Sequence, residues 1–212
     1  MISFLTQTIH ESKAPILCLL KNAAECERYH QDLAFLLMGT GKTVAFLPDY
    51  EVTLDDDFSP AAAVVSQRLS ILHQLLNQQI DVLITTEQQA LTLLPPKSFV
   101  AQNVFSFKVG DRINMTRFKS NLVQLDYSLV NHISSPKQCA VRGAIIDIYP
   151  PQTKHPIRIE LDDDEIVGIH LFHIETQRSF PEDIQHIEVT PSIEYLPEAV
   201  DAKHIALQNP AH

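Results

Sequence analysis

The segment GTGKT, residues 39–43, contains the residue types that bind phosphate. In a loop of the form G-x-x-x-x-G-K-[ST], backbone N–H groups and the lysine hold phosphate, and the hydroxyl binds magnesium. Gly41, Lys42 and Thr43 match the end of that pattern, but Leu36 stands where its first glycine belongs. Such a loop follows a strand and begins a helix, whereas here a helix-like stretch comes first and Pro48 closes a short strand after it. A glycine turn from a helix into a strand is the favoured interpretation, and a nucleotide site is the alternative.

Two acidic runs and one pair of histidines could in principle bind metal. The runs Asp55–Asp57 and Asp162–Glu165 both fall where the chain is expected to turn, the second of them between two apolar strands. His170 and His173 lie at an odd spacing in a predicted strand, so their side chains point to opposite faces and cannot chelate one ion. The sequence therefore predicts no catalytic residue, no metal site and no cofactor.

Two arginines stand in otherwise apolar strands. Arg142 lies between Val141 and Gly143. Arg158 lies between two isoleucines, so its side chain faces away from the side of the strand that they bury. Arginine suits bidentate pairing with carboxylates and is enriched at the centres of protein interfaces. Internal pairing with an acidic neighbour such as Asp147 or Glu160 explains both residues equally well. The residues alone leave these two interpretations open.

The first hundred residues alternate apolar runs with amphipathic stretches, which predicts a parallel sheet covered on both faces. The predicted strands are Ala14–Leu20, Thr43–Leu47 and Asp81–Thr85. The predicted helices cover residues 21–37, residues 59–77 from a Ser59-Pro60 start, and a short stretch that Thr86 and Gln89 cap and Pro95-Pro96 end.

The pattern changes after a boundary near residues 96–106. One short helix, Thr116–Gln124, is followed by closely spaced strands that predict a largely antiparallel meander. These strands are Ala140–Tyr149, Pro156–Leu161, Glu165–Ile174 and one at about His186–Val189. The tail from Leu196 is expected to be extended.

The chain has 212 residues and a formal net charge of -10, which argues against non-specific nucleic-acid binding by the whole surface. Residues 106–150 are the exception, with 6 basic and 3 acidic side chains between two acidic segments. Direct DNA binding by this segment is a second alternative, through Lys108, Arg112, Arg117 and Lys119.

Nothing in the sequence indicates a membrane or secreted protein. The apolar runs are far shorter than the ~20 residues that cross a bilayer, and the first residues lack the basic start of a signal peptide. Three cysteines, Cys18, Cys26 and Cys139, are too few for a disulfide framework. The expected location is the reducing cytoplasm.

Several stretches together resemble the UvrB-homology region of bacterial transcription-repair coupling factors. The second module of that region is indicated by Val141–Pro150, Ile157–Leu161 with Asp164-Glu165-Ile166, and Thr176–Ser179. The first module is indicated more loosely by Leu47–Glu51, Phe58-Ser59-Pro60 and Ser66–Leu69. The resemblance runs from about residue 14 to about residue 195.

The resemblance implies a partner and the residues that contact it. Coupling factors of this family recognise RNA polymerase stalled at a DNA lesion and recruit the excision-repair protein UvrA through their UvrB-like region. The arginines that contact UvrA in the family match Arg142 and Arg158, sixteen positions apart without a gap. A further contact is an aromatic residue just after the second arginine's strand. Here Asp162 follows Leu161 at that place, so the resemblance makes Leu161 and Asp162 the other two expected contact residues. The resemblance thus favours the interface interpretation of the arginines.

It also implies the organisation of the chain. The fold class is α/β, with an incomplete Rossmann-like parallel-sheet module at residues 1–105, a smaller α+β module with an antiparallel meander at 106–195, and an extended tail at 196–212. The family's degenerate phosphate loop, polymerase-binding module and motor domains are expected outside this sequence. The function expected from the sequence is a non-enzymatic adaptor that recruits UvrA.

Overall fold

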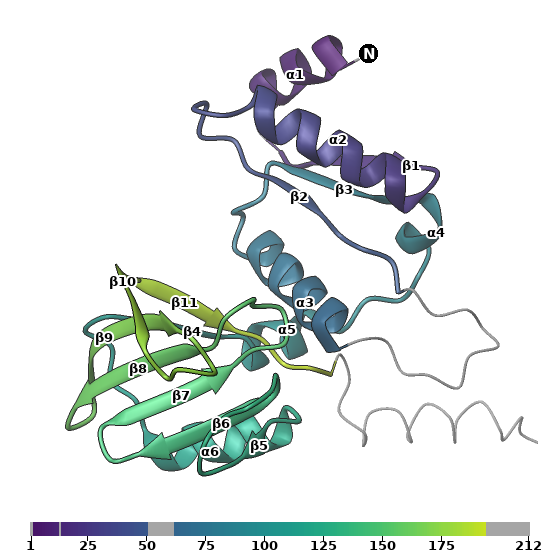
Figure 1. Ribbon diagram of the computed structural model, residues 1–212. Helices are drawn as coiled ribbons and strands as arrows, with labels where there is room; N and C mark the ends of the chain where they lie inside the picture. Colours follow the sequence, from purple (N-terminus) through teal and green to yellow (C-terminus); the bar gives the residue numbers. More distant parts are fainter. Residues whose placement is uncertain (1, 13, 51–61, 194–212) are drawn as a thin grey trace, which may run out of the picture.

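The computed structural model describes residues 2–12, 14–50 and 62–193. Helices and strands alternate through the first half of the chain, and strands dominate the second half (Figure 1). The predicted α/β class is confirmed, with one parallel sheet and one antiparallel meander. Two of the sequence features, Asp55–Asp57 and the Ser59-Pro60 helix start, lie outside the described residues, as does the tail from Leu196.

The first sheet is parallel and has the strand order β1-β3-β2. Its strands are β1 (Ile16–Leu20), β2 (Val44–Phe46) and β3 (Val82–Thr86). The central strand β3 is buried along its whole length, because helices cover both faces of the sheet. Helices α1 (Ile2–Glu11) and α2 (Ala23–Leu36) lie on one side and α3 (Ala62–Leu76) on the other (Figure 1). All three predicted strands are confirmed, whereas α1 was not expected.

Arg68 of α3 fixes the segment that follows β2. Its guanidinium is fully buried, donates to the carbonyl oxygen of Pro48 at 2.5 Å and lies 4.1 Å from the ring centroid of Tyr50. Asp49 accepts a hydrogen bond from Oγ1 of Thr86 at 2.7 Å. Residues 47–50, the described part of the Leu47–Glu51 stretch quoted above for its resemblance, thus meet Ser66–Leu69 at the end of the first sheet.

The connection to the second half of the chain corrects one expectation. The capping pattern is confirmed, since Oγ1 of Thr86 accepts from the Gln89 N–H at the start of α4 (Glu87–Ala90). However, α4 ends before the two prolines, and Pro96 is the N-cap of a further helix, α5 (Lys97–Asn103), which leads into β4 (Phe105–Lys108). Proline suits the first turn of a helix because its missing N–H would find no partner there.

The second sheet has six strands in the order β10-β9-β8-β7-β6-β5. Its strands pair antiparallel, except for β5 and β6, which are parallel. The bounds are β5 (Ser128–Leu129), β6 (Gln138–Arg142), β7 (Ile145–Tyr149), β8 (Ile157–Asp162), β9 (Glu165–Phe172) and β10 (Ser179–Asp183). The predicted meander is confirmed, although β5 and β10 were not expected.

One predicted strand was wrong in detail, and another pairs outside the predicted meander. The stretch Ala140–Tyr149 is a hairpin rather than one strand, because Gly143 has a φ of +58° and turns the chain between Arg142 and Ile145. A two-residue loop with glycine first is a common hairpin connection, since glycine adopts positive φ without strain. The strand β11 (His186–Val189) exists as expected, but it pairs antiparallel with β4 in a separate two-stranded sheet.

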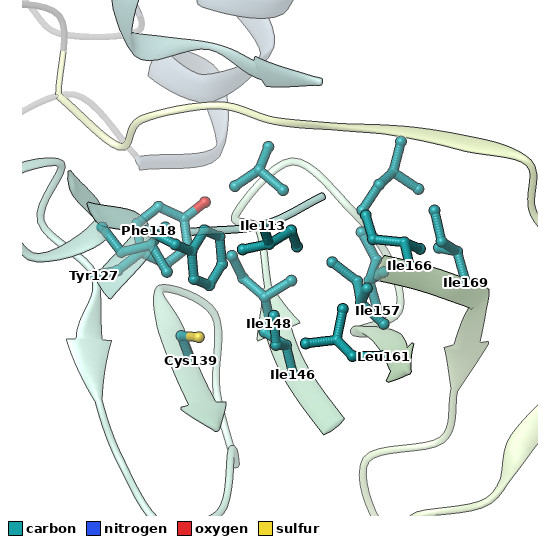
Figure 2. Packing of buried hydrophobic residues seen from close by; sticks show 14 of the residues in the cluster. Ile113, Phe118, Tyr127, Cys139, Ile146, Ile148, Ile157, Leu161, Ile166 and Ile169 are labelled. Atoms are coloured by element: carbon teal, nitrogen blue, oxygen red, sulfur yellow. The ribbon is translucent and has the colours of Figure 1, made fainter. Parts of the chain in front are cut away.

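The helix α6 (Met115–Gln124) covers the inner face of the six-stranded sheet, close to its predicted range. Asn114 caps it by accepting from the Arg117 N–H at 2.9 Å. Figure 2 shows isoleucines of β7, β8 and β9 packed together with Phe118 and Tyr127. Cys139 is fully buried among them as a free thiol, and this burial raises its pKa to about 12.

The segment after β11 returns to the first half of the chain. Ser66 of α3 donates from Oγ to the carbonyl oxygen of Pro191 at 2.6 Å. His73 of the same helix lies 3.1 Å from Oε1 of Glu188 in β11. Among the described residues, each hydrophobic cluster draws its members either from residues up to 104 or from residues 105 onward. No helix of that part of the chain is long and apolar enough to cross a membrane.

Tyr127 fastens this returning segment to the core of the second sheet. Its hydroxyl is buried and donates to the carbonyl oxygen of Thr190 at 2.8 Å. We expect Tyr127→Phe to lower the free energy of unfolding by about 1–3 kcal/mol, because that carbonyl loses its partner inside the protein. Urea denaturation followed by circular dichroism measures the loss.

Tyr149→Phe is the matched control, since its hydroxyl donates to the carbonyl oxygen of Lys154 near the surface, at 3.1 Å. Water can replace that bond, so we expect a change below about 0.5 kcal/mol. Equal losses in the two variants would contradict the role given to Tyr127.

Candidate interaction surface on the six-stranded sheet

The outer face of the six-stranded sheet carries a row of polar side chains. Asp147 of β7 pairs with Ala140 of β6 on one side and with Arg158 of β8 on the other, and Arg158 pairs with His170 of β9. Directly paired residues of antiparallel strands point to the same face. Arg142 ends β6 on this face, two residues further along the strand than Ala140. The register therefore brings the two predicted arginines to one carboxylate.

Asp147 is that carboxylate, and it is only 1% exposed. Its Oδ1 accepts from Nε of Arg158 at 2.7 Å, and its Oδ2 accepts from Nη2 of the same residue at 3.0 Å. Nη2 of Arg142 also donates to Oδ2, at 2.5 Å. Internal pairing, one of the two interpretations left open above, is thus present for both arginines.

The guanidinium of Arg158 is held from further sides. It lies 4.5 Å from the ring centroid of Phe172, and its Nη1 donates to the carbonyl oxygen of Gln177 at 3.2 Å. The hydrogen bonds with Asp147 raise the pKa of Arg158, against the effect of burial. Its side chain is 14% exposed, whereas that of Arg142 is 37% exposed. Arg142 is therefore the arginine with more surface available to a partner.

The Thr176–Ser179 stretch explains part of this arrangement. Gln177 has a φ of +58°, its N–H donates to the carbonyl oxygen of His173 at 2.8 Å, and its Nε2 donates to that of Ile174 at 2.6 Å. This tight turn aims the carbonyl of Gln177 at Arg158. From the sequence this stretch was noted only for its resemblance to the family. Its hydrogen bond to Arg158 could not be predicted, because every residue type has a backbone carbonyl.

The other two predicted contact residues lie in different surroundings. Leu161 is buried in the core behind the sheet (Figure 2). Asp162 is exposed at the end of β8, where it pairs with Glu165 across the hairpin. The structure thus brings Arg142 and Arg158 together, and it places Leu161 on the opposite face.

The acidic run at residues 162–165 forms the expected hairpin turn, and Arg112 lies 3.4 Å from Asp164. His173 lies beyond the end of β9, which stops two residues earlier than expected, and its ring packs 4.2 Å from that of Phe180. The structure thus differs from the prediction that His170 and His173 share one strand. Within the described residues, no group of three or more histidines, cysteines and carboxylates could hold a metal ion.

The GTGKT segment is the turn between α2 and β2, as the favoured interpretation predicted. Gly39 and Gly41 have φ values of +80° and +77°, which glycine adopts readily. Nζ of Lys42 lies 2.8 Å from Oδ1 of Asp81, and Oδ2 of the same carboxylate accepts from the Thr43 N–H at 2.8 Å. Lys42 and Thr43 thus join the starts of β2 and β3, and a strand rather than a helix follows the turn.

The comparison with protein families gives one match to this part of the chain. Residues 105–195 match the model of the UvrB interaction domain. Residues 105–195 belong to that family. The match includes the whole six-stranded sheet, α6 and the β4–β11 pair, and the resemblance stated from the sequence is confirmed.

Known relatives extend the similarity beyond the UvrB interaction domain. The chain is 31% identical to the transcription-repair-coupling factor of Haemophilus influenzae over 156 residues, which cover 74% of this chain and 14% of that protein. The Escherichia coli factor is 28% identical over 181 residues, which cover 85% of this chain and 15% of that protein. The Bacillus subtilis factor is 28% identical over 193 residues, which cover 91% of this chain and 16% of that protein. The chain thus spans about one seventh of the length of these relatives.

The candidate DNA-binding residues lie on β4, on α6 and between these two elements. Lys108 is on β4, Arg112 precedes α6, and Arg117 and Lys119 are on α6. Arg112 and Arg117 line a cleft of about 680 Å³ with asparagine and phenylalanine side chains. Because Arg112 also lies beside Asp164 and Glu165, part of its charge is already balanced.

We expect no DNA complex in a gel shift with a short duplex, even at low salt, where phosphate contacts are strongest. The net charge of the chain opposes such binding. A complex that weakens steeply with added salt and is lost in Arg117→Ala would revive the DNA-binding alternative.

For Lys42 we expect a structural contribution. Lys42 and the Thr43 N–H hold the pKa of Asp81 below its ordinary value of 3.8. A carboxyl whose pKa is lower in the folded than in the unfolded protein stabilises the fold at pH values above its unfolded pKa. This stabilisation is lost as the pH falls through its folded pKa. Lys42→Ala should therefore cost up to about 1 kcal/mol at neutral pH, since the pair is partly exposed. The difference should shrink in urea denaturation at about pH 3.

Lys21→Ala serves as the control, because Lys21 is exposed and lies outside the ion pairs of the described residues. A titration with labelled ATP and magnesium tests the nucleotide-binding alternative on the same proteins. Saturable binding by the parent that disappears in Lys42→Ala would overturn the structural account of this turn.

Proposed function

We propose that the chain is a non-catalytic adaptor module of transcription-coupled nucleotide excision repair, which recruits UvrA to RNA polymerase stalled at a lesion. Two findings support this proposal: the UvrB interaction domain at residues 105–195, and relatives named transcription-repair-coupling factors. In this proposal residues 106–195 contact UvrA and residues 1–105 are a scaffold. In this proposal the chain itself contacts neither DNA nor RNA polymerase.

The observation that carries the proposal is the arginine pair on the outer sheet face. Arg142 and Arg158 come from different strands, share Asp147, and lie at the positions that resemble the UvrA contacts of the family. A guanidinium offers several N–H groups in a planar fork that matches a carboxylate. Acidic side chains of UvrA would therefore pair with this face.

The contact would determine orientation and rate of association more than raw affinity. Charge pairs at an interface steer encounter and fix register, while buried apolar neighbours supply much of the binding free energy. Asp162 is exposed at the position where the family has an aromatic residue, so this chain would lack that apolar contact. Leu161, the fourth predicted residue, would support the face from the core.

We expect Arg142→Ala and Arg158→Ala each to weaken binding to purified UvrA by about tenfold or more, because removing one partner of a hydrogen-bonded charge pair costs about 2–5 kcal/mol. Surface plasmon resonance with the chain immobilised measures the affinity. Circular dichroism checks that each variant folds, which matters most for Arg158, the more buried of the two.

Arg178→Ala is the matched control, since Arg178 is exposed on the loop before β10. It removes the same charge without touching Asp147, and UvrA should bind it within about twofold of the parent. The interface assignment is wrong if UvrA binds the Arg142 and Arg158 variants as well as it binds the parent.

A further inference from the structure

The two arginines differ in how much of their hydrogen-bonding capacity is already used. An arginine has five N–H donors. Arg158 donates from Nε and Nη2 to Asp147 and from Nη1 to Gln177, so all three of its nitrogens are engaged. Arg142 is engaged through Nη2, at Oδ2 of Asp147. The N–H groups available for a new carboxylate are therefore mainly those of Arg142.

Asp147 also sets the charge of the face. Two guanidinium groups on the strands either side of β7 would repel each other without an anion between them. The buried carboxylate balances one of their two charges, and Glu160 on the same face also acts on Arg158. What remains for a partner is the forked N–H groups of Arg142, the more exposed of the two arginines. Such a site fits a single carboxylate of a partner rather than a broad acidic patch.

We propose that Asp147 is a positioning residue for the partner contact: it holds Arg158 in place, and the two together orient Arg142 toward one carboxylate of UvrA. This inference rests on the proposed function. It assigns the direct pairing to Arg142, and it gives Arg158 an indirect role through the shared carboxylate. Phe172 below the guanidinium of Arg158 and the Gln177 carbonyl beside it complete the support.

A simpler account predicts the opposite effect of one substitution. If positive charge alone attracted UvrA, removing a negative charge from this face would strengthen binding, since attraction grows with net charge. If orientation decides, removing the charge of Asp147 frees both arginines and weakens binding. Asp147→Asn, which keeps size and shape, separates the two accounts by the sign of the change.

We expect Asp147→Asn to weaken UvrA binding by about tenfold or more, at unchanged secondary structure. Glu160→Gln is the matched control, because Glu160 lies on the same face, is 46% exposed, and acts on Arg158 through its charge alone. It makes the same change in charge, and its UvrA affinity should equal that of the parent or exceed it slightly. Affinity of Asp147→Asn equal to or above that of the parent overturns the inference.

A measurement on the parent protein keeps the test valid if Asp147→Asn fails to fold. Nuclear magnetic resonance of the arginine Nε–H groups reports whether each is protected from exchange with water. We expect the Arg158 signal to exchange about tenfold or more slowly than that of Arg178, because a buried carboxylate accepts its hydrogen bond. Equal exchange rates would show that Asp147 does not hold Arg158.

Adding UvrA to the same sample separates this inference from the proposed function. The Nε–H signal of Arg142 should shift most, while that of Arg158 stays protected. A parent chain that does not bind UvrA at all overturns the proposed function itself. Binding with a large shift and loss of protection at Arg158 supports that function but overturns the positioning role of Asp147.

Discussion

A carboxylate buried inside a sheet must be neutralised, and Asp147 meets this constraint with two arginines from the neighbouring strands. Leaving such a charge unpaired costs several kcal/mol. The requirement restricts how β6, β7 and β8 can align, because a slip by one residue would turn each side chain to the other face. The same pairing places the arginines, so packing of the sheet and geometry of the proposed interface have one cause.

The core behind the sheet reinforces this alignment. Ile146 and Ile148 flank Asp147 in β7 and point to the opposite face, where they pack with the isoleucines of β8 and β9 (Figure 2). Moving Asp147 inward would bury its charge in an apolar core and expose these isoleucines, at about 1.5–3 kcal/mol for each side chain. The polar face therefore depends on the apolar one.

Local patterns allowed much of the fold to be predicted from the sequence. Alternation identified β8, apolar runs identified β1 and β3, and the Thr86 cap identified α4, because each depends on neighbouring residues. The pairing of β11 with β4 could not be predicted, since it joins residues about eighty positions apart in a two-stranded sheet. The hairpin at Gly143 was missed because its two-residue loop, Gly143-Ala144, contains none of the Asn, Asp or Pro residues that usually mark a turn.

The candidate site, too, could be predicted where it depends on neighbouring residues and not where it depends on strand pairing. Spacing along the chain placed Arg142 and Arg158 in strands and named Asp147 as a neighbour, but it could not show that one carboxylate serves both. That fact depends on the register of three strands, which is a property of the packed sheet. Gln177 contributes through its backbone carbonyl, which residue type cannot reveal.

The junction between the two halves of the chain has a thermodynamic consequence. Within the described residues, the hydrophobic clusters divide at residue 105, and a serine hydroxyl and a histidine–glutamate pair are among the contacts that join the halves. Cores that share little buried apolar area lend each other little free energy. We therefore expect each half to melt as its own cooperative unit, so that heating would pass through a state with one half folded. A single melting temperature would then describe neither half. The order of the two transitions would show which half stays folded after the other has unfolded.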